Sequence, residues 1–212
     1  MCIKECIMDY VRLLLLPTRV YIKRKKSGLG ESARSELIRG WTTGWLIFSL
    51  IICVCFLVIP SKFILNNIVL IFLSGLCAYV AFSRANEILG AFLQDSFDKL
   101  EEGDDKEEIR YSERIKLALG SYGELILDFA IIYYFLNSIL SSKFTFFDNK
   151  FNSIIEAIYF SGATITTLGS NIYPKYWITQ LLSIYEVIDG MVLLFFTLAI
   201  YVSAANKIKK NN

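Results

Sequence analysis

Four carboxylates lie inside apolar segments of the chain, where an ionisable side chain is costly and suggests a function. Glu186 and Asp189 are three residues apart, so on a helix they share one face. Glu124 and Asp128 are four residues apart and share a face in the same way. Carboxylates in such positions either attract cations or accept hydrogen bonds from neighbouring helices, and both roles are open for these four.

The chain has no histidine, although it has 22 basic and 20 acidic residues. This absence excludes Ser/His/Asp and Cys/His triads and H-E-x-x-H zinc sites. We therefore do not expect an enzyme, and a membrane-embedded enzyme or signalling protein is the weaker alternative. The charges cluster between apolar runs, so we expect no nucleic-acid partner. We also expect no bound cofactor.

The composition is typical of an all-α membrane protein. Of the 212 residues, 55% are hydrophobic and the mean hydropathy is +0.49, whereas soluble domains are about 45 to 50% apolar. Stretches long enough to cross a hydrocarbon core of about 30 Å predict four transmembrane helices. Two form a helical hairpin over residues 41–83, and the others cover residues 117–141 and 175–205.

Lysine and arginine residues gather in the segments 1–40, 84–116 and 206–212. The positive-inside rule then places both termini and the middle connection in the cytoplasm. We expect segment 1–40 to be amphipathic and to lie on the lipid bilayer, and segment 84–116 to form a charged helix and loop. Its acidic run lacks the spacing of an EF-hand, so calcium binding is the minor alternative. The protein is expected to be integral and multi-pass, in a plasma or bacterial inner membrane.

The hairpin carries no ladder of basic residues. Lys62 and Arg84 are predicted to flank its helices, so strong voltage gating is not expected. Glu124 is predicted to lie near enough to the cytoplasmic end of its helix to meet a lysine or arginine there. The sequence identifies no regulatory partner.

A shorter apolar stretch, Phe151 to Pro174, lies between the last two transmembrane helices. Ser153 and Glu156 have the spacing of a capping box, which predicts a helix over residues 152–166. Such a helix is too short to span a membrane, so we expect it to enter and leave on the same side. Non-helical backbone at that depth must be buried in protein or line a water-filled cavity, which indicates a pore.

The same stretch resembles the pore helix and filter of the potassium channel family, whose pattern is roughly A-[LI]-[YW]-[FW]-S-x-x-T-x-T-T-[VL]-G-Y-G-D-[IL]-Y-P. The matching residues are Ala157, Ile158, Tyr159, Phe160, Ser161, Thr164, Thr166, Thr167, Leu168, Gly169, Ile172, Tyr173 and Pro174. The resemblance implies a pore domain over residues 117–205, made of an outer helix (117–141), a pore helix (152–166), a filter (167–171) and an inner helix (175–205). It leaves the hairpin unexplained.

The resemblance implies a homotetramer, because each chain has one pore loop and the family closes its pore with four. The implied ion-conduction and selectivity residues are Thr166, Thr167, Leu168, Gly169, Ser170 and Asn171. Potassium, or another monovalent cation, would pass at Thr167, Leu168, Gly169 and Ser170, where backbone carbonyls replace its water shell. Gly190 matches the gating hinge of the inner helix, with close packing against the outer helix as the alternative. Glu186 and Asp189 are candidates to line the cavity or to bond behind the filter.

One departure affects the filter. The family has Gly-Tyr-Gly-Asp where this chain has the shorter Gly169-Ser170-Asn171. Gly169 suits the first left-handed backbone position, and Asn171 is the candidate for the second, because asparagine adopts that conformation more readily than most residues. We expect a cation channel that conducts potassium passively. The alternatives are a weakly selective cation channel and a non-conducting membrane interaction or effector protein with a degenerate pore loop.

Overall fold

The computed structural model describes residues 31–59, 61–102, 111–140 and 145–211. Its helices are α3 (Glu31–Val58), α4 (Ser61–Leu65), α5 (Ile68–Glu102), α6 (Tyr111–Tyr134), the π-helical turn η1 (Phe135–Ile139), α7 (Ile154–Ile165) and α8 (Trp177–Asn211). In these ranges the β pairing is one isolated bridge between Phe147 and Pro174. The all-α fold class is therefore confirmed. Most of the predicted interfacial segment and the acidic run at 103–110 fall outside the described residues.

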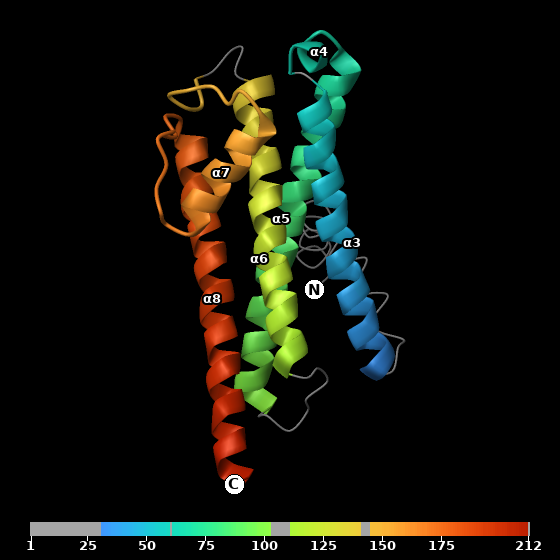
Figure 1. Ribbon diagram of the computed structural model, residues 1–212, viewed down its shortest axis with the longest axis vertical. Coiled ribbons are helices and arrows are strands. Elements are labelled where there is room, and N and C mark those ends of the chain that lie inside the picture. Colours follow the sequence, from blue (N-terminus) through green and yellow to red (C-terminus); the bar gives the residue numbers. More distant parts are fainter. Residues whose placement is uncertain (1–30, 60, 103–110, 141–144, 212) are drawn as a thin grey trace, which may run out of the picture.

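The long helices run alternately up and down the bundle (Figure 1). Within the described residues, three stretches are long and apolar enough to cross a membrane, namely Glu36–Val58, Ile68–Gln94 and Trp177–Ala199. The second and third of these run in the same direction, and α6, drawn in yellow in Figure 1, runs back between them. Helix α6 is not among the three stretches, so its crossing of the membrane stays a prediction.

Helix α7 and the loop after it occupy one end of the bundle only. In Figure 1, α7 descends partway from the upper end, and the following loop returns to that end, where α8 begins. The 12 residues of α7 extend about 18 Å, well short of a hydrocarbon core. This is the re-entrant element that the sequence predicts.

The start of α7 differs in detail from the predicted capping box. Ser153 is the N-cap residue and has an extended backbone, but its side chain makes no capping hydrogen bond. The Glu156 carboxylate instead accepts hydrogen bonds from the backbone N–H of Asn152 (2.8 Å) and from its side-chain amide (2.9 Å). The carboxylate thus reaches one residue further back than a capping box requires.

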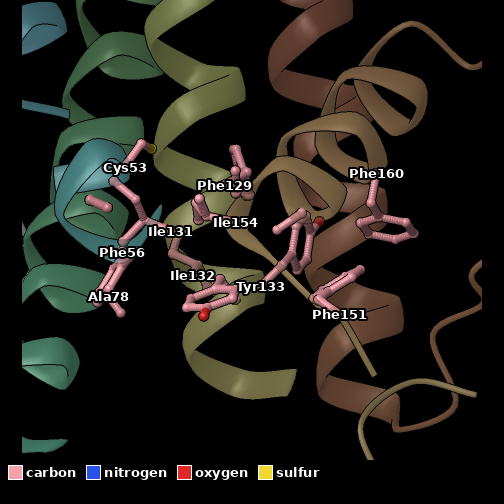
Figure 2. Close-up of a cluster of buried hydrophobic side chains, with 14 of the residues drawn as sticks. Cys53, Phe56, Ala78, Phe129, Ile131, Ile132, Tyr133, Phe151, Ile154 and Phe160 are labelled. Atoms are coloured by element: carbon pink, nitrogen blue, oxygen red, sulfur yellow. The ribbon is translucent and has the colours of Figure 1, made fainter. Parts of the chain in front are cut away.

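The core forms around α6, which contacts α3, α5, α7 and α8. Its residues Leu125, Phe129 and Tyr133 are fully buried. Tyr133 lies beside aromatic residues of the pore loop, with ring centroids 5.0 Å from Phe160 and 5.8 Å from Phe147. Figure 2 shows Tyr133 between the α6 core residues and the pair Phe151 and Phe160. This aromatic packing fixes α7 against α6.

Arg84, which the sequence predicts to flank the second span, is buried inside the bundle. The residue lies within the stretch Ile68–Gln94 and is only 4% exposed. Its Nε donates to Glu124 Oε1 (2.5 Å) and its Nη2 to Glu124 Oε2 (3.3 Å), while Nη1 lies 2.9 Å from Glu87 Oε1. The helix continues past residue 83 because Ala85 and Ile88 remain buried in the core. The predicted basic partner of Glu124 is therefore Arg84.

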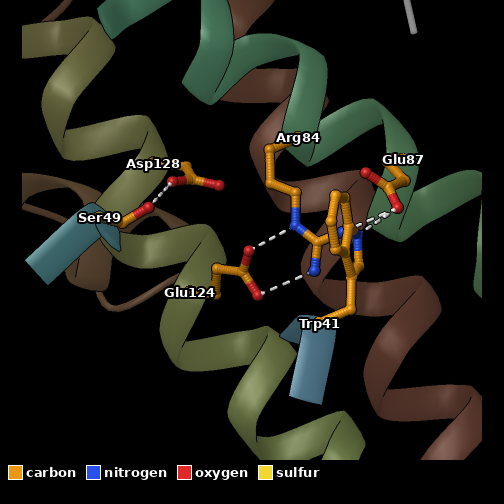
Figure 3. Close-up of polar contacts among 6 residues, drawn as sticks. All are labelled: Trp41, Ser49, Arg84, Glu87, Glu124 and Asp128. Carbon is orange, nitrogen blue, oxygen red and sulfur yellow. Dashed lines mark hydrogen bonds and ion pairs between the residues drawn. The ribbon is translucent and has the colours of Figure 1, made fainter. Parts of the chain in front are cut away.

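The same polar residues attach α3 to the bundle (Figure 3). The Trp41 indole donates to Glu87 Oε1 (3.0 Å), and the Ser49 hydroxyl donates to Asp128 Oδ1 (2.6 Å). We call this set the Arg84 cluster; it consists of Trp41, Ser49, Arg84, Glu87, Glu124 and Asp128. It joins both helices of the hairpin to α6.

Candidate functional site

The pore helix α7 ends in a Schellman motif. The N–H of Thr167 donates to the carbonyl of Thr164 (2.9 Å), and the N–H of Leu168 donates to that of Ala163 (2.9 Å). This pattern requires a left-handed residue directly after the C-cap, where glycine is usual. Here the C-cap is Thr166 and the left-handed residue is Thr167, with φ of 58°. The motif therefore turns the chain sharply out of the helix and into the predicted filter.

Left-handed backbone recurs two residues later, at Gly169, with φ of 80°. The alternation expected of the filter is thus present, but it is placed at Thr167 and Gly169. Among the described residues other than glycine, only Thr167 has a positive φ, so the prediction that Asn171 supplies the second left-handed position is wrong. The second left-handed position is instead Thr167, because the Schellman turn imposes left-handed backbone on that residue.

The predicted filter lies at the surface of the single chain. Residues 166–169 and Asn171 are exposed, and Leu168 is 81% exposed. Ser170 is partly buried, and its hydroxyl donates to the carbonyl of Ile172 (2.9 Å). Backbone carbonyls and the Thr166 and Thr167 hydroxyls are the cation ligands that such a segment offers. No group of three or more cysteine and carboxylate side chains that could hold a metal ion occurs in the part of the chain that the structure describes.

The loop before α7 holds the outer end of this segment. Asp148 accepts a hydrogen bond from the N–H of Tyr173 (2.8 Å), and its own N–H donates to the Tyr173 carbonyl (3.1 Å). The Phe146 carbonyl accepts the N–H of Lys175 (2.9 Å) and the Thr179 hydroxyl (2.9 Å). The loop before α7 therefore holds the outer end of the predicted filter, while the Schellman motif of α7 holds its inner end. No local pattern in the sequence indicates this role of Asp148, because its partner Tyr173 lies 25 residues away.

Glu186 joins three helices behind the filter. Its Oε2 accepts the Tyr133 hydroxyl of α6 (2.8 Å), and its Oε1 accepts the Ser161 hydroxyl of α7 (2.5 Å). All three side chains are fully buried. Of the two predicted roles, the geometry supports bonding behind the filter, because a fully buried carboxylate does not line a cavity. The partner Tyr133 gave no signal in the sequence, where it is one more aromatic residue in an apolar run.

Gly190 lies one helical turn after Glu186 and meets the end of the pore helix. A Cβ atom at Gly190 would lie 2.5 Å from Ile165 Cγ1 and 3.2 Å from the Ile165 carbonyl oxygen. Close packing is thus observed, but against α7 and not against the outer helix. The contact between Ile165 and Gly190 lies four residues further along both helices than the contact between Ser161 and Glu186. Helices α7 and α8 therefore touch at two levels that are one helical turn apart.

Asp189 has a different environment from Glu186. It is fully buried, yet neither of its carboxylate oxygens has a hydrogen-bond partner among the described residues. Burying a carboxylate without a partner is costly. The burial of the Asp189 carboxylate therefore costs free energy at a position directly beside Gly190.

Comparison with known proteins agrees with this geometry. Residues 122–207 match the family model described as an ion channel, and this range includes most of α6, all of α7, the exposed filter segment and most of α8. Curated proteins and solved structures gave no significant match. The match and the membrane-crossing helices make this an integral membrane protein. Residues 122–207 of this chain therefore form a potassium-channel-like ion channel domain, which contains α7 and the exposed filter segment.

Proposed function

We propose that four copies of this chain assemble into a cation channel that conducts potassium passively through a filter at residues 167–171. The observation that carries the proposal is the re-entrant helix α7, whose C-terminus leads directly into exposed backbone with left-handed residues at Thr167 and Gly169. The negative end of the helix dipole points into the membrane at that place, which favours a cation there.

The geometry of one chain supports assembly from several copies. A single filter segment forms only one wall of a conduction path, and here it lies exposed. Helix α8 also exposes an apolar stripe spaced by three and four residues, which includes Trp177, Leu181, Ile184, Ile188 and Met191. Such spacing suits packing against equivalent helices around a common axis. We therefore propose that this stripe and the filter face the other three subunits and the pore.

Preference for potassium rests on how firmly the shortened filter is held. Its inner end is fixed by the Schellman motif, its outer end by Asp148, and the pore helix behind it by Glu186. These contacts take the place of the tyrosine packing that the chain lacks. The permeant ion is then coordinated by the carbonyls of Thr167, Leu168, Gly169 and Ser170.

The orientation follows from the distribution of basic residues. We propose that both termini and the end of the bundle opposite the filter face the cytoplasm, in a plasma or bacterial inner membrane. Transport of this kind requires no covalent chemistry and no bound cofactor.

Two measurements on purified protein test the proposal. Native mass measurement in detergent should give four chains of 24.2 kDa each, and potassium-loaded vesicles containing the protein should release potassium. Vesicles with the Gly169→Ala variant are the control, because this change strains the filter while the fold remains. A monomer or dimer that releases no potassium would favour the non-conducting interaction protein instead.

A further inference from the structure

The hairpin α3–α5 lies outside the matched domain, yet it contacts the inner helix of the pore directly. Helix α5 packs along α8 as well as along α6. The Tyr185 hydroxyl of α8 donates to Asn86 Oδ1 of α5 at 2.9 Å, and the ring centroids of Phe82 and Tyr185 are 6.2 Å apart. These contacts hold α8 on the filter side of Gly190.

A second contact between the same helices lies on the other side of Gly190. The rings of Phe92 and Phe196 meet edge to face, with centroids 5.2 Å apart and an interplanar angle of 82°. This is a favourable aromatic geometry. Because Tyr185 and Phe196 lie on opposite sides of Gly190, α5 bridges the one position in this part of α8 where a glycine weakens the helix.

Helix α5 is itself fixed to the rest of the bundle. Arg84 pairs with Glu124 of α6 in two hydrogen bonds. The α8 segment before Gly190 is tied to the same frame, because Glu186 accepts the Tyr133 hydroxyl of α6. The α8 segment after Gly190 rests on the hairpin through Phe92. A bend of α8 at Gly190 would therefore separate Phe196 from Phe92 and leave the contacts of Tyr185 and Glu186 in place.

Asp189 gives such a bend a driving force. The carboxylate is fully buried and has no hydrogen-bond partner among the described residues. Motion that admits water to Asp189 lowers the cost of burying it. In this structure α8 is one uninterrupted helix from Trp177 to Asn211, so the contacts that favour the straight helix dominate.

We propose that the hairpin regulates the pore: α5 holds α8 straight across Gly190 and keeps the pore closed, and release of Phe196 from Phe92 lets α8 bend and open it. This inference rests on the proposed function, because opening has a meaning only for a conducting pore. It also assigns a role to the part of the chain that the family resemblance leaves unexplained.

The test compares Phe92→Ala with Leu93→Ala in the full-length protein. Leu93 is the next residue of α5, but it is 38% exposed. Its truncation to alanine therefore controls for the change in helix propensity and the loss of apolar area in α5. Hydrogen exchange of backbone amides at residues 186–199 reports how readily the helical hydrogen bonds of α8 open, and it can be measured whether or not the protein conducts. Single-channel recording reports the open probability.

We expect Phe92→Ala to speed exchange after Gly190 and to raise the open probability about two- to tenfold, the range expected for one aromatic pair. Leu93→Ala should change neither quantity, and Phe196→Ala added to Phe92→Ala should have little further effect. Unchanged exchange in Phe92→Ala, or faster exchange with an unchanged or lower open probability, would overturn the inference. Faster exchange in protein that never conducts would instead remove the proposed function and leave the α5–α8 contact established.

Discussion

Gly190 of the inner helix lies directly against Ile165, the last residue of the pore helix. No side chain larger than hydrogen fits between them, because a Cβ at Gly190 would lie 2.5 Å from Ile165 Cγ1. The contact brings the predicted hinge of α8 to the point where the filter begins. Any displacement of α8 at this level is therefore transmitted to the end of α7.

The first prediction concerns this contact. Gly190→Ala should lower the stability of the assembled protein by about 1 to 3 kcal/mol, the usual effect of overpacking, and should disturb conduction. Thermal unfolding in detergent measures the first effect and vesicle flux the second. Gly123→Ala on α6 is the control, because a Cβ there meets no atom within 4 Å. Adding Ile165→Ala should partly rescue Gly190→Ala, and a Gly190→Ala protein as stable as the control would contradict the observed packing.

The second prediction concerns Glu186. Replacement by alanine leaves the buried Tyr133 and Ser161 hydroxyls without their acceptor, so we expect a loss of about 2 to 4 kcal/mol in unfolding free energy. Glu186→Gln keeps an acceptor of the same shape and should lose less. The selectivity of the channel should follow the same order if Glu186 positions the filter. A Glu186→Ala channel with wild-type selectivity would limit the residue to a structural role.

The third prediction concerns the Arg84 cluster. Arg84→Leu leaves the buried carboxylate of Glu124 unpaired and leaves Glu87 with the Trp41 indole alone, which should cost about 3 to 5 kcal/mol. The double variant Arg84→Leu/Glu124→Leu removes both charges of the main pair and should be more stable than the single variant. Chemical or thermal unfolding of the wild type, the two single variants Arg84→Leu and Glu124→Leu, and the double variant measures these differences. Additive losses in the double variant would mean that the two side chains do not interact.

The fourth prediction concerns Gly169, where a side chain would strain the backbone of the filter without meeting any neighbouring atom. Gly169 has φ of 80° and open space where a Cβ would be, so Gly169→Ala should act through backbone strain of about 1 to 2 kcal/mol. Potassium that binds the filter stabilises the assembly by mass action, and this stabilisation should be lost in Gly169→Ala. The helical control Gly162→Ala has only ordinary contact with Ile126, at 3.9 Å, and should retain it. Thermal midpoints measured in potassium and in a large organic cation give the comparison.

Much of the fold was predictable because it depends on local patterns. Apolar length identified three stretches that can cross a membrane, and the short apolar stretch before Pro174 identified helix α7. Gly169 was correctly assigned to left-handed backbone because glycine adopts it at low cost.

The misassigned residues depend on contacts between distant parts of the chain. The burial of Arg84 was not predicted, because its partner Glu124 is 40 residues away and no local pattern reveals a buried ion pair. Thr167 was not expected to be left-handed, since threonine is a poor candidate for that conformation. The hydrogen bonds that impose it arise only when α7 ends in a Schellman motif.

The most direct test of the account is the reversal potential of purified protein in a planar bilayer, with potassium on one side and sodium on the other. If the residues from Thr167 to Ser170 form a potassium-selective filter, the current should reverse near the potassium equilibrium potential, and Gly162→Ala should reverse at the same voltage. A reversal near zero would contradict potassium selectivity and leave a weakly selective cation channel. The absence of current at all voltages, in the wild type and in Phe92→Ala alike, would contradict the proposed conduction itself.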